Sequence, residues 1–185
     1  MRVTGGDAKG ARLRTLKGGD TRPTTDQARK AIFDILGPGA VDGARVLDLF
    51  AGTGALGIEA LSRGAAEAVF VESSREACSI IMNNLAASQC RGKGIVRRAD
   101  AERFLSRKAH PAFDLAFLDP PYARGLGFVA QILGKLGSGA WVRTGGTVIV
   151  ESVVGDVSWP EGFRETKVRP FGRTQLAVAV RDDDA

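Results

Sequence analysis

Between residues 45 and 181 short apolar runs alternate with longer amphipathic segments, and this alternation limits the fold more than any other feature of the sequence. Uninterrupted apolar runs are typical of parallel strands buried on both faces, and the amphipathic segments are typical of helices that cover the sheet. We therefore predict a Rossmann-like α/β fold with a mostly parallel, seven-stranded sheet. The predicted strands span residues 45–50, 68–72, 94–98, 113–119, 147–151, 163–168 and 175–181.

The ends of these elements carry further signals. No helix-length segment separates the last two apolar runs, so we expect them to close the sheet as an antiparallel hairpin. Two segments match the capping box, in which a Ser or Thr side chain caps the start of a helix. They are Thr24-x-x-Gln27 and Ser73-x-x-Glu76, which predict helices near residues 26–36 and 74–87.

The excess positive charge of the chain lies in residues 1–30. This segment holds eight Lys and Arg against three Asp, and its net charge of +5 equals that of the whole sequence. Such a concentration in a glycine-rich segment is typical of a surface that contacts nucleic-acid phosphates. We expect residues 1–24 to form a basic N-terminal arm or short hairpin outside the sheet, and residues 25–185 to form the α/β domain. The residues expected to contact nucleic acid are Arg2, Lys9, Arg12, Arg22, Thr24 and Arg29.

Two alternatives for this segment stay open. The charge alone is also compatible with a solvated arm that serves solubility. Arg22 and Arg29 are also compatible with pairing to core carboxylates such as Glu59, which would dock the helix instead of gripping phosphates. If the arm is a separate contact surface, removing residues up to Gly19 should spare the α/β core.

A glycine turn follows the first predicted strand. The strand ends at Asp48-Leu49-Phe50, and Ala51-Gly52-Thr53-Gly54-Ala55-Leu56-Gly57 leads into a helix. Glycines allow the backbone to approach a ligand closely, and the helix start offers N–H groups to an anionic part of it. Glu72 ends the second strand 20 residues after Gly52, where an acid can bind the hydroxyls of a ribose. The turn therefore predicts a pocket for an adenosine-type cofactor.

The glycine spacing alone does not identify the cofactor, since Gly52-x-Gly54-x-x-Gly57 also satisfies the nicotinamide dinucleotide pattern. Asp48 favours S-adenosylmethionine, because a carboxylate at the strand end can hold a cationic amino-acid group and would repel a pyrophosphate. The alternative is that Asp48 only braces the glycine loop. The expected cofactor-binding residues are Asp48, Phe50, Ala51, Gly52, Thr53, Gly54, Glu72, Asp100 and Ala101.

Asp100 and Ala101 follow the third strand, where the carboxylate and a backbone N–H can contact an adenine. An ordinary N-cap for a helix over residues 101–107 explains Asp100 nearly as well.

The tetrapeptide Asp119-Pro120-Pro121-Tyr122 follows the fourth strand and is the most specific local signal. The Asp119 carboxylate and the Pro120 carbonyl can accept the two N–H bonds of an amino group and aim its lone pair at a methyl carbon. Tyr122 offers a face on which a base can stack. These four residues are the predicted catalytic residues, and a target base would have to be flipped out or unpaired to reach them. The alternative is a Pro-Pro turn with a capping aspartate.

Other features exclude function classes. No apolar run approaches the length of a membrane helix and the N-terminus lacks an apolar signal stretch, so we expect a cytoplasmic protein, acting as a monomer. Cys78 and Cys90 lack the spacing of a zinc site or a disulfide framework and predict buried thiols, with no metal. His110 is expected at the surface.

These residues together resemble the RsmD family of bacterial 16S ribosomal RNA guanine-N2 methyltransferases over nearly the whole chain. The matching segments are Gly5-Gly6, Lys9-Gly10, Leu13, Arg22-Pro23-Thr24-Thr25-Asp26, Arg29, the stretch 48–63, Asp119-Pro120-Pro121-Tyr122 and Val150-Glu151-Ser152. The resemblance implies a class I S-adenosylmethionine-dependent methyltransferase fold. It also implies methyl transfer to the N2 amine of guanine 966 in 16S ribosomal RNA, on a partly assembled small (30S) subunit.

The sequence departs from this family at two places: Ser73-Ser74 stands where a further aspartate is usual, and Arg173 where an acid is expected. The first departure leaves the acid Glu72 in place, so the expected cofactor binding is retained. The second lies in the loop around Arg173, so the exact placement of the substrate there does not follow from the resemblance. Three other functions remain as alternatives: adenine-N6 methylation of DNA or RNA, a nicotinamide-dependent oxidoreductase, and RNA binding with an inactive pocket. The chain has no room for a separate module that reads the major groove, which argues against DNA.

Overall fold

The computed structural model describes residues 1–16, 24–107 and 111–182, without the side chains of residues 24–26. Within these ranges the strands form one sheet in the order β3-β2-β1-β4-β5-β7-β6. The strands are β1 Arg45–Leu49, β2 Glu67–Glu72, β3 Gly94–Arg98, β4 Phe113–Leu118, β5 Val142–Val153, β6 Phe163–Phe171 and β7 Thr174–Arg181. The helices are α1 Thr24–Leu36, α2 Ala55–Ser62, α3 Arg75–Ala87, α4 Ala101–Leu105 and α5 Gly125–Ser138, with short 3-10 turns η1 Arg91–Lys93 and η2 Tyr122–Arg124.

The pairing confirms the predicted α/β fold. Strands β1 to β5 are parallel, and β7 lies antiparallel between β5 and β6, so the last two strands form the expected hairpin. The order reverses between β1 and β4, and the carboxyl ends of these two strands bound the crevice where open α/β sheets bind ligands.

Several predicted boundaries differ from the structure: α1 begins at Thr24, α4 ends at Leu105 and β6 runs to Phe171. Strand β5 begins at Val142, before the predicted start, because the chain pairs with β4 on both sides of Gly145 and Gly146 through a register shift. Helix α3 is capped by Ser74, whose Oγ accepts from the Ala77 amide at 3.3 Å, and not by Ser73 of the predicted capping box. Sequence spacing does not separate two adjacent serines.

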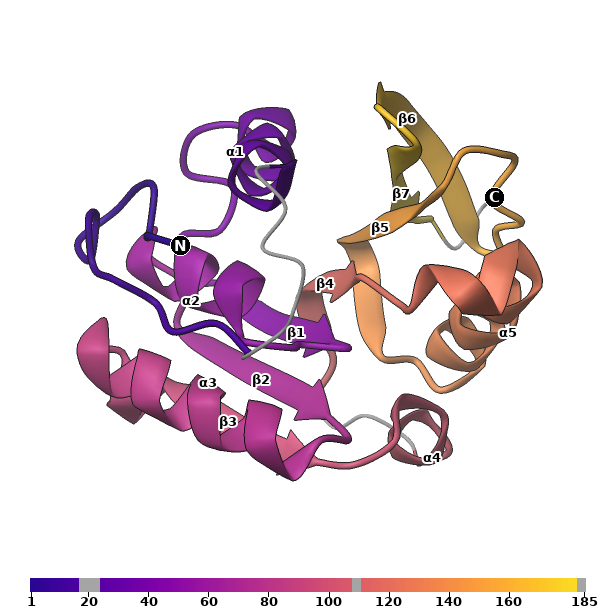
Figure 1. The fold of residues 1–185 in the computed structure, drawn as a ribbon. Coiled ribbons are helices and arrows are strands. Elements are labelled where there is room, and N and C mark those ends of the chain that lie inside the picture. The colour runs from indigo at the N-terminus through magenta and orange to yellow at the C-terminus, as the bar shows by residue number, and fades with distance from the viewer. Residues whose placement is uncertain (17–23, 108–110, 183–185) are drawn as a thin grey trace.

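Helices cover both faces of the sheet (Figure 1). Each face has its own hydrophobic cluster. On one face α1, α2 and α3 pack on the sheet; on the other face lie α4 and α5. Strand β1 shows the alternation, since Val46 belongs to the first cluster and Leu47 to the second. No helix in the described part of the chain is long and apolar enough to span a membrane. Cys78 and Cys90 are buried free thiols, as predicted.

The basic N-terminus forms a short hairpin outside the sheet, closed by an antiparallel bridge between Arg2 and Arg12. This hairpin is docked on the domain, because Val3 and Leu13 are buried in the same cluster as α1 and α2. Its backbone is also held by side chains of the domain: the Arg14 amide donates to Asn84 Oδ1 at 2.7 Å and the Ala8 amide to Ser62 Oγ at 2.9 Å. These contacts argue against the expectation that residues up to Gly19 can be removed without cost to the core.

Candidate active site

The glycine turn between β1 and α2 has the backbone that its sequence requires. Gly52 and Gly54 have φ values of 54° and 78°, in the left-handed region that glycine adopts without strain, and Phe50 before them has a φ of 60°, which is uncommon for a residue with a side chain. Gly54 is the N-cap of α2 and has no side chain with which to occupy the amides of the helix start. A Cβ on Gly57 would lie 2.3 Å from Phe70 Cε1 and 3.1 Å from Asp48 Oδ2. The third glycine of the pattern thus lets α2 pack directly on β2 and on Asp48.

Asp48 is buried at the base of this turn. Its Oδ2 accepts a hydrogen bond from the Gly57 amide at 2.9 Å, so the bracing role that the sequence left open is present. The pKa of Asp48 is raised to about 8: burial is the largest cause, the Gly57 hydrogen bond lowers the pKa, and the charges of Asp119 and Glu72 add smaller increases. Asp48 also lines a cavity, so one carboxylate braces the loop and faces a ligand site.

Glu72 links the glycine turn to the start of α3. Its Oε2 accepts from the Gly52 amide at 2.9 Å and its Oε1 from the Ser74 amide at 2.8 Å. These bonds fix the carboxylate at the carboxyl end of β2, and each oxygen keeps acceptor capacity for a ribose hydroxyl. The ribose contact stays a prediction.

Asp100 is the N-cap of α4, where its Oδ1 accepts from the Arg103 amide at 3.0 Å. Ala101 is buried as the first residue of that helix. Neither of them is among the residues that line the two cavities at the crevice. The structure thus shows the capping role, and the adenine contact stays a prediction.

The tetrapeptide after β4 lies at the centre of the crevice. Asp119 is exposed, Pro120 is buried and Tyr122 begins η2. The Tyr122 hydroxyl donates to Glu151 Oε1 at 2.5 Å, which joins the tetrapeptide to β5. Glu151 is not among the site residues predicted from the sequence, although it is the last residue of the predicted strand 147–151.

Two cavities meet at these residues. The first has a volume of about 220 Å³ and includes Asp48, the glycine turn and Arg29 in its lining. The second, of about 840 Å³, is lined by Glu72, the tetrapeptide and the turn between β6 and β7. Both are lined by Phe50, Gly52, Asp119 and Glu151. A donor bound at the glycine turn and an acceptor bound in the larger cavity would therefore meet at Asp119.

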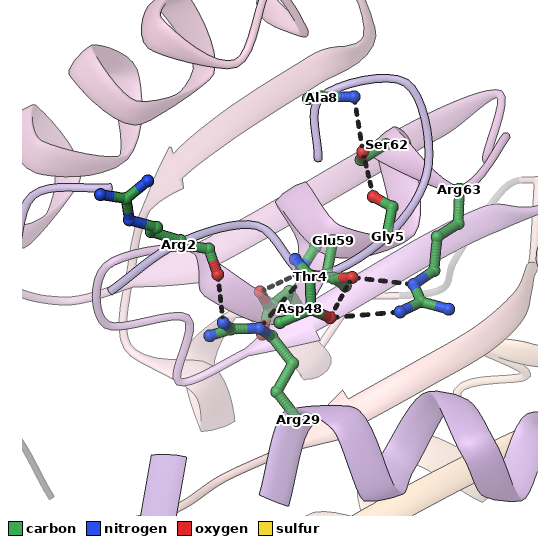
Figure 2. A network of polar contacts seen from close by, with 10 residues as sticks. Arg2, Thr4, Gly5, Ala8, Arg29, Asp48, Glu59, Ser62 and Arg63 are labelled. Carbon is green, nitrogen blue, oxygen red and sulfur yellow. Dashed lines mark hydrogen bonds and ion pairs between the residues drawn. The ribbon is translucent and has the colours of Figure 1, made fainter. Parts of the chain in front are cut away.

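Arg29 has a different position from the one we predicted. Its side chain is 3% exposed, and its Nε lies 3.3 Å from Oε2 of the fully buried Glu59 (Figure 2). One of its terminal nitrogens donates to the Arg2 carbonyl at 2.5 Å. A buried, ion-paired guanidinium is not available to phosphates, so the predicted RNA contact of Arg29 was wrong and the alternative pairing with Glu59 was right.

The other predicted RNA contacts divide into two groups. Arg2, Lys9 and Arg12 are exposed on the N-terminal hairpin, so a phosphate contact by them stays a prediction. Arg22 lies outside the described residues, as does the side chain of Thr24, which is the first residue of α1. His110 also lies outside the described residues.

Known proteins resemble this chain over most of its length. The family model described as "Conserved hypothetical protein 95" matches residues 1–180. "Ribosomal RNA small subunit methyltransferase D" of Escherichia coli (strain K12) is 38% identical over 83% of this chain and 75% of its own length. "Putative rRNA methyltransferase YlbH" of Bacillus subtilis (strain 168) is 46% identical over 66% of this chain and 67% of its own length.

A solved structure shows the same fold. The protein described as "Putative methyltransferase yhhF from Escherichia coli" superposes with a TM-score of 0.89 at 33% identity, covering 99% of this chain and 98% of the other. The chain belongs to the family described as conserved hypothetical protein 95, the RsmD family of methyltransferases.

Proposed function

We propose that this protein transfers a methyl group from S-adenosylmethionine to the exocyclic N2 amine of a guanine in 16S ribosomal RNA. The observation that carries the proposal is the position of Asp119, which lines both the cavity at the glycine turn and the larger open cavity. The names of the relatives support ribosomal RNA of the small subunit as the substrate. The family resemblance points to guanine 966, on a partly assembled small subunit in the cytoplasm.

The residues of the glycine turn and of the carboxyl ends of β1 and β2 fit S-adenosylmethionine. Gly52 and Gly54 leave backbone space in the turn, and Glu72, which lines the larger cavity beside Gly52, presents a fixed carboxylate suited to the hydroxyls of a ribose. Asp48 offers a carboxylate to the ammonium of the amino-acid group, and the start of α2 offers N–H groups to its carboxylate. When bound there, the cofactor supplies an electrophilic methyl group on a sulfonium.

Asp119 and Pro120 position the acceptor. Asp119 follows β4 directly, and Pro120 and Pro121 restrict the backbone that carries its carboxylate. In this proposal the carboxylate and the Pro120 carbonyl accept both N–H bonds of an amino group and orient the nitrogen lone pair toward the first cavity. After the new N–C bond forms, the amine loses one proton, for which the Asp119 carboxylate is the neighbouring acceptor.

Tyr122 and Glu151 shape the larger cavity. The hydrogen bond from the tyrosine hydroxyl to Glu151 fixes the ring beside Asp119, where a base extruded from the RNA can stack on it. A base within a helix cannot enter this cavity, so the enzyme acts on a flipped or unpaired guanine.

Replacement of Asp119 tests this proposal. We expect Asp119→Ala to lower kcat on small-subunit particles at least 100-fold, because the amine loses its positioning group, while affinity for S-adenosylhomocysteine changes less than threefold. Asp156→Asn, at an exposed acid in the loop after β5, is the matched control and should retain normal turnover. An Asp119→Ala enzyme with normal kcat would exclude this site as the place of transfer.

A further inference from the structure

We propose that the β6–β7 hairpin carries a second phosphate-contact surface for the RNA substrate, formed by Lys167, Arg169 and Arg173. This inference rests on the proposed function and concerns a part of the chain far in sequence from the basic N-terminus. The three residues are defined here as the hairpin cations. All three are exposed.

The strand register places two of these cations on one face. Lys167 pairs with Val178 and Arg169 with Leu176, and directly opposed residues of an antiparallel pair project to the same side. Leu176 and Val178 belong to the hydrophobic cluster that α1 and α2 cover. Lys167 and Arg169 therefore lie on that same face of the sheet, on the edge strand β6 next to the apolar residues of β7.

The turn of the hairpin brings this face to the active-site crevice. Gly172 and Arg173 form a two-residue turn between the paired residues Phe171 and Thr174, and Gly172 has φ 64° at the first position, as in type II′ turns. Phe171 and Arg173 line the larger cavity together with Asp119 and Tyr122. A nucleotide in this cavity would thus have its flanking phosphates next to Arg173, with Arg169 following along β6.

The charges on this hairpin are not balanced by its acids. Within the described residues no salt bridge involves any of the hairpin cations. The acids near them have other partners: Glu165 accepts from Trp159 Nε1 at 2.8 Å, and Asp182 pairs with Arg164 at 3.2 Å. Uncompensated cations beside a cavity that receives a nucleotide favour a polyanionic partner.

The main competing explanation is protection of the sheet edge. Strand β6 is an edge strand, and charged residues together with a proline such as Pro170 reduce unwanted pairing with other chains. That role needs charge on the strand but predicts no effect on RNA affinity. Salt dependence separates the two explanations, because only a phosphate contact releases counterions.

The test compares two triple variants. In the first, Lys167, Arg169 and Arg173 are replaced by Gln; in the control, the exposed cations Arg91, Lys93 and Arg97 are replaced by Gln at η1 and β3, the opposite edge of the sheet. Affinity for small-subunit particles that lack the methyl group is measured from 50 to 200 mM salt. Melting temperature and affinity for S-adenosylhomocysteine are measured in parallel.

We expect the hairpin variant to flatten the plot of log affinity against log salt by roughly 2 to 2.7, since each lost phosphate contact removes about 0.7 to 0.9. The affinity loss should then be roughly 20- to 40-fold larger at 50 mM than at 200 mM salt. The control variant should keep the wild-type slope, and both variants should keep their melting temperature and their affinity for S-adenosylhomocysteine.

An unchanged slope in the hairpin variant, or an equal flattening in the control, would overturn the inference. Failure of the proposed function looks different: the wild-type protein would not methylate the particles at all. The salt slopes do not depend on turnover, so they judge the hairpin separately.

Discussion

Glu59 is the residue on which the docking of the N-terminal hairpin most depends. It is fully buried in α2 and accepts three hydrogen bonds, from the Thr4 amide at 2.8 Å, the Thr4 hydroxyl at 2.7 Å and Arg63 Nε at 2.8 Å (Figure 2). It also forms an ion pair with Arg29, whose Nε lies 3.3 Å away. One carboxylate therefore joins the hairpin, α1 and α2. Glu59→Gln preserves the size of the side chain and removes its charge.

The cost of this substitution follows from the burial of Arg29. With a neutral partner the guanidinium stays in the interior without its counter-charge, and removing one member of a buried ion pair costs roughly 3–5 kcal/mol. For a chain of this size each kcal/mol lowers the melting temperature by about 2–4 °C, so the variant should melt roughly 6–20 °C lower. The amides of Val3 and Leu13, which bond within the hairpin, should also lose protection from hydrogen exchange.

Thermal unfolding and amide exchange measure these effects. Glu67→Gln is the matched control, since Glu67 pairs with Arg45 at 2.8 Å at a partly exposed site and should cost at most about 1 kcal/mol. If Glu59→Gln melts within 2 °C of the wild type and keeps the hairpin amides protected, the hairpin is not held by this carboxylate and our account of its docking is incorrect.

Two further predictions concern the glycine turn. Asp48 has a pKa of about 8, so below pH 7 it is mostly neutral, and binding a cationic ammonium must expel its proton. Affinity for S-adenosylhomocysteine should therefore rise about tenfold per pH unit from pH 5.5 to 7, with about one proton released in calorimetry, and a flat profile would contradict this role. Gly57→Ala places a Cβ 2.3 Å from the Phe70 ring, so we expect a loss of about 1–3 kcal/mol in urea unfolding and weaker cofactor binding; wild-type stability would refute the close packing.

The sequence predicted the features that depend on local pattern. The β1–glycine turn–α2 segment and the hairpin of β6 and β7 have strong local signals, and the structure has both. Asp48 lies near the carboxyl end of β1 and Asp119 directly follows β4. The two residues come together because β1 and β4 are neighbours in the sheet. The carboxyl ends of parallel strands share one edge of the sheet, so this convergence was predictable without side-chain detail.

The features that the sequence did not predict depend on tertiary packing. Arg29 looked like a phosphate contact in a basic segment, and only the burial of α1 against α2 shows that it meets Glu59. The hydrogen bond between Tyr122 and Glu151 needs β4 and β5 to be adjacent, which a linear sequence does not state. The charge of residues 1–30 likewise does not indicate that Val3 and Leu13 anchor the N-terminal hairpin in the core.

The most direct test of the central claim is methylation of small-subunit particles from a bacterial strain that lacks this activity. The purified protein is incubated with these particles and labelled S-adenosylmethionine, and the RNA is digested to nucleosides and mapped by mass spectrometry. We predict one methyl group per particle, recovered as N2-methylguanosine at a single position of 16S ribosomal RNA, and none with Asp119→Ala. Label in N6-methyladenosine or in ribosomal protein, or no transfer with the wild-type protein, would contradict the account.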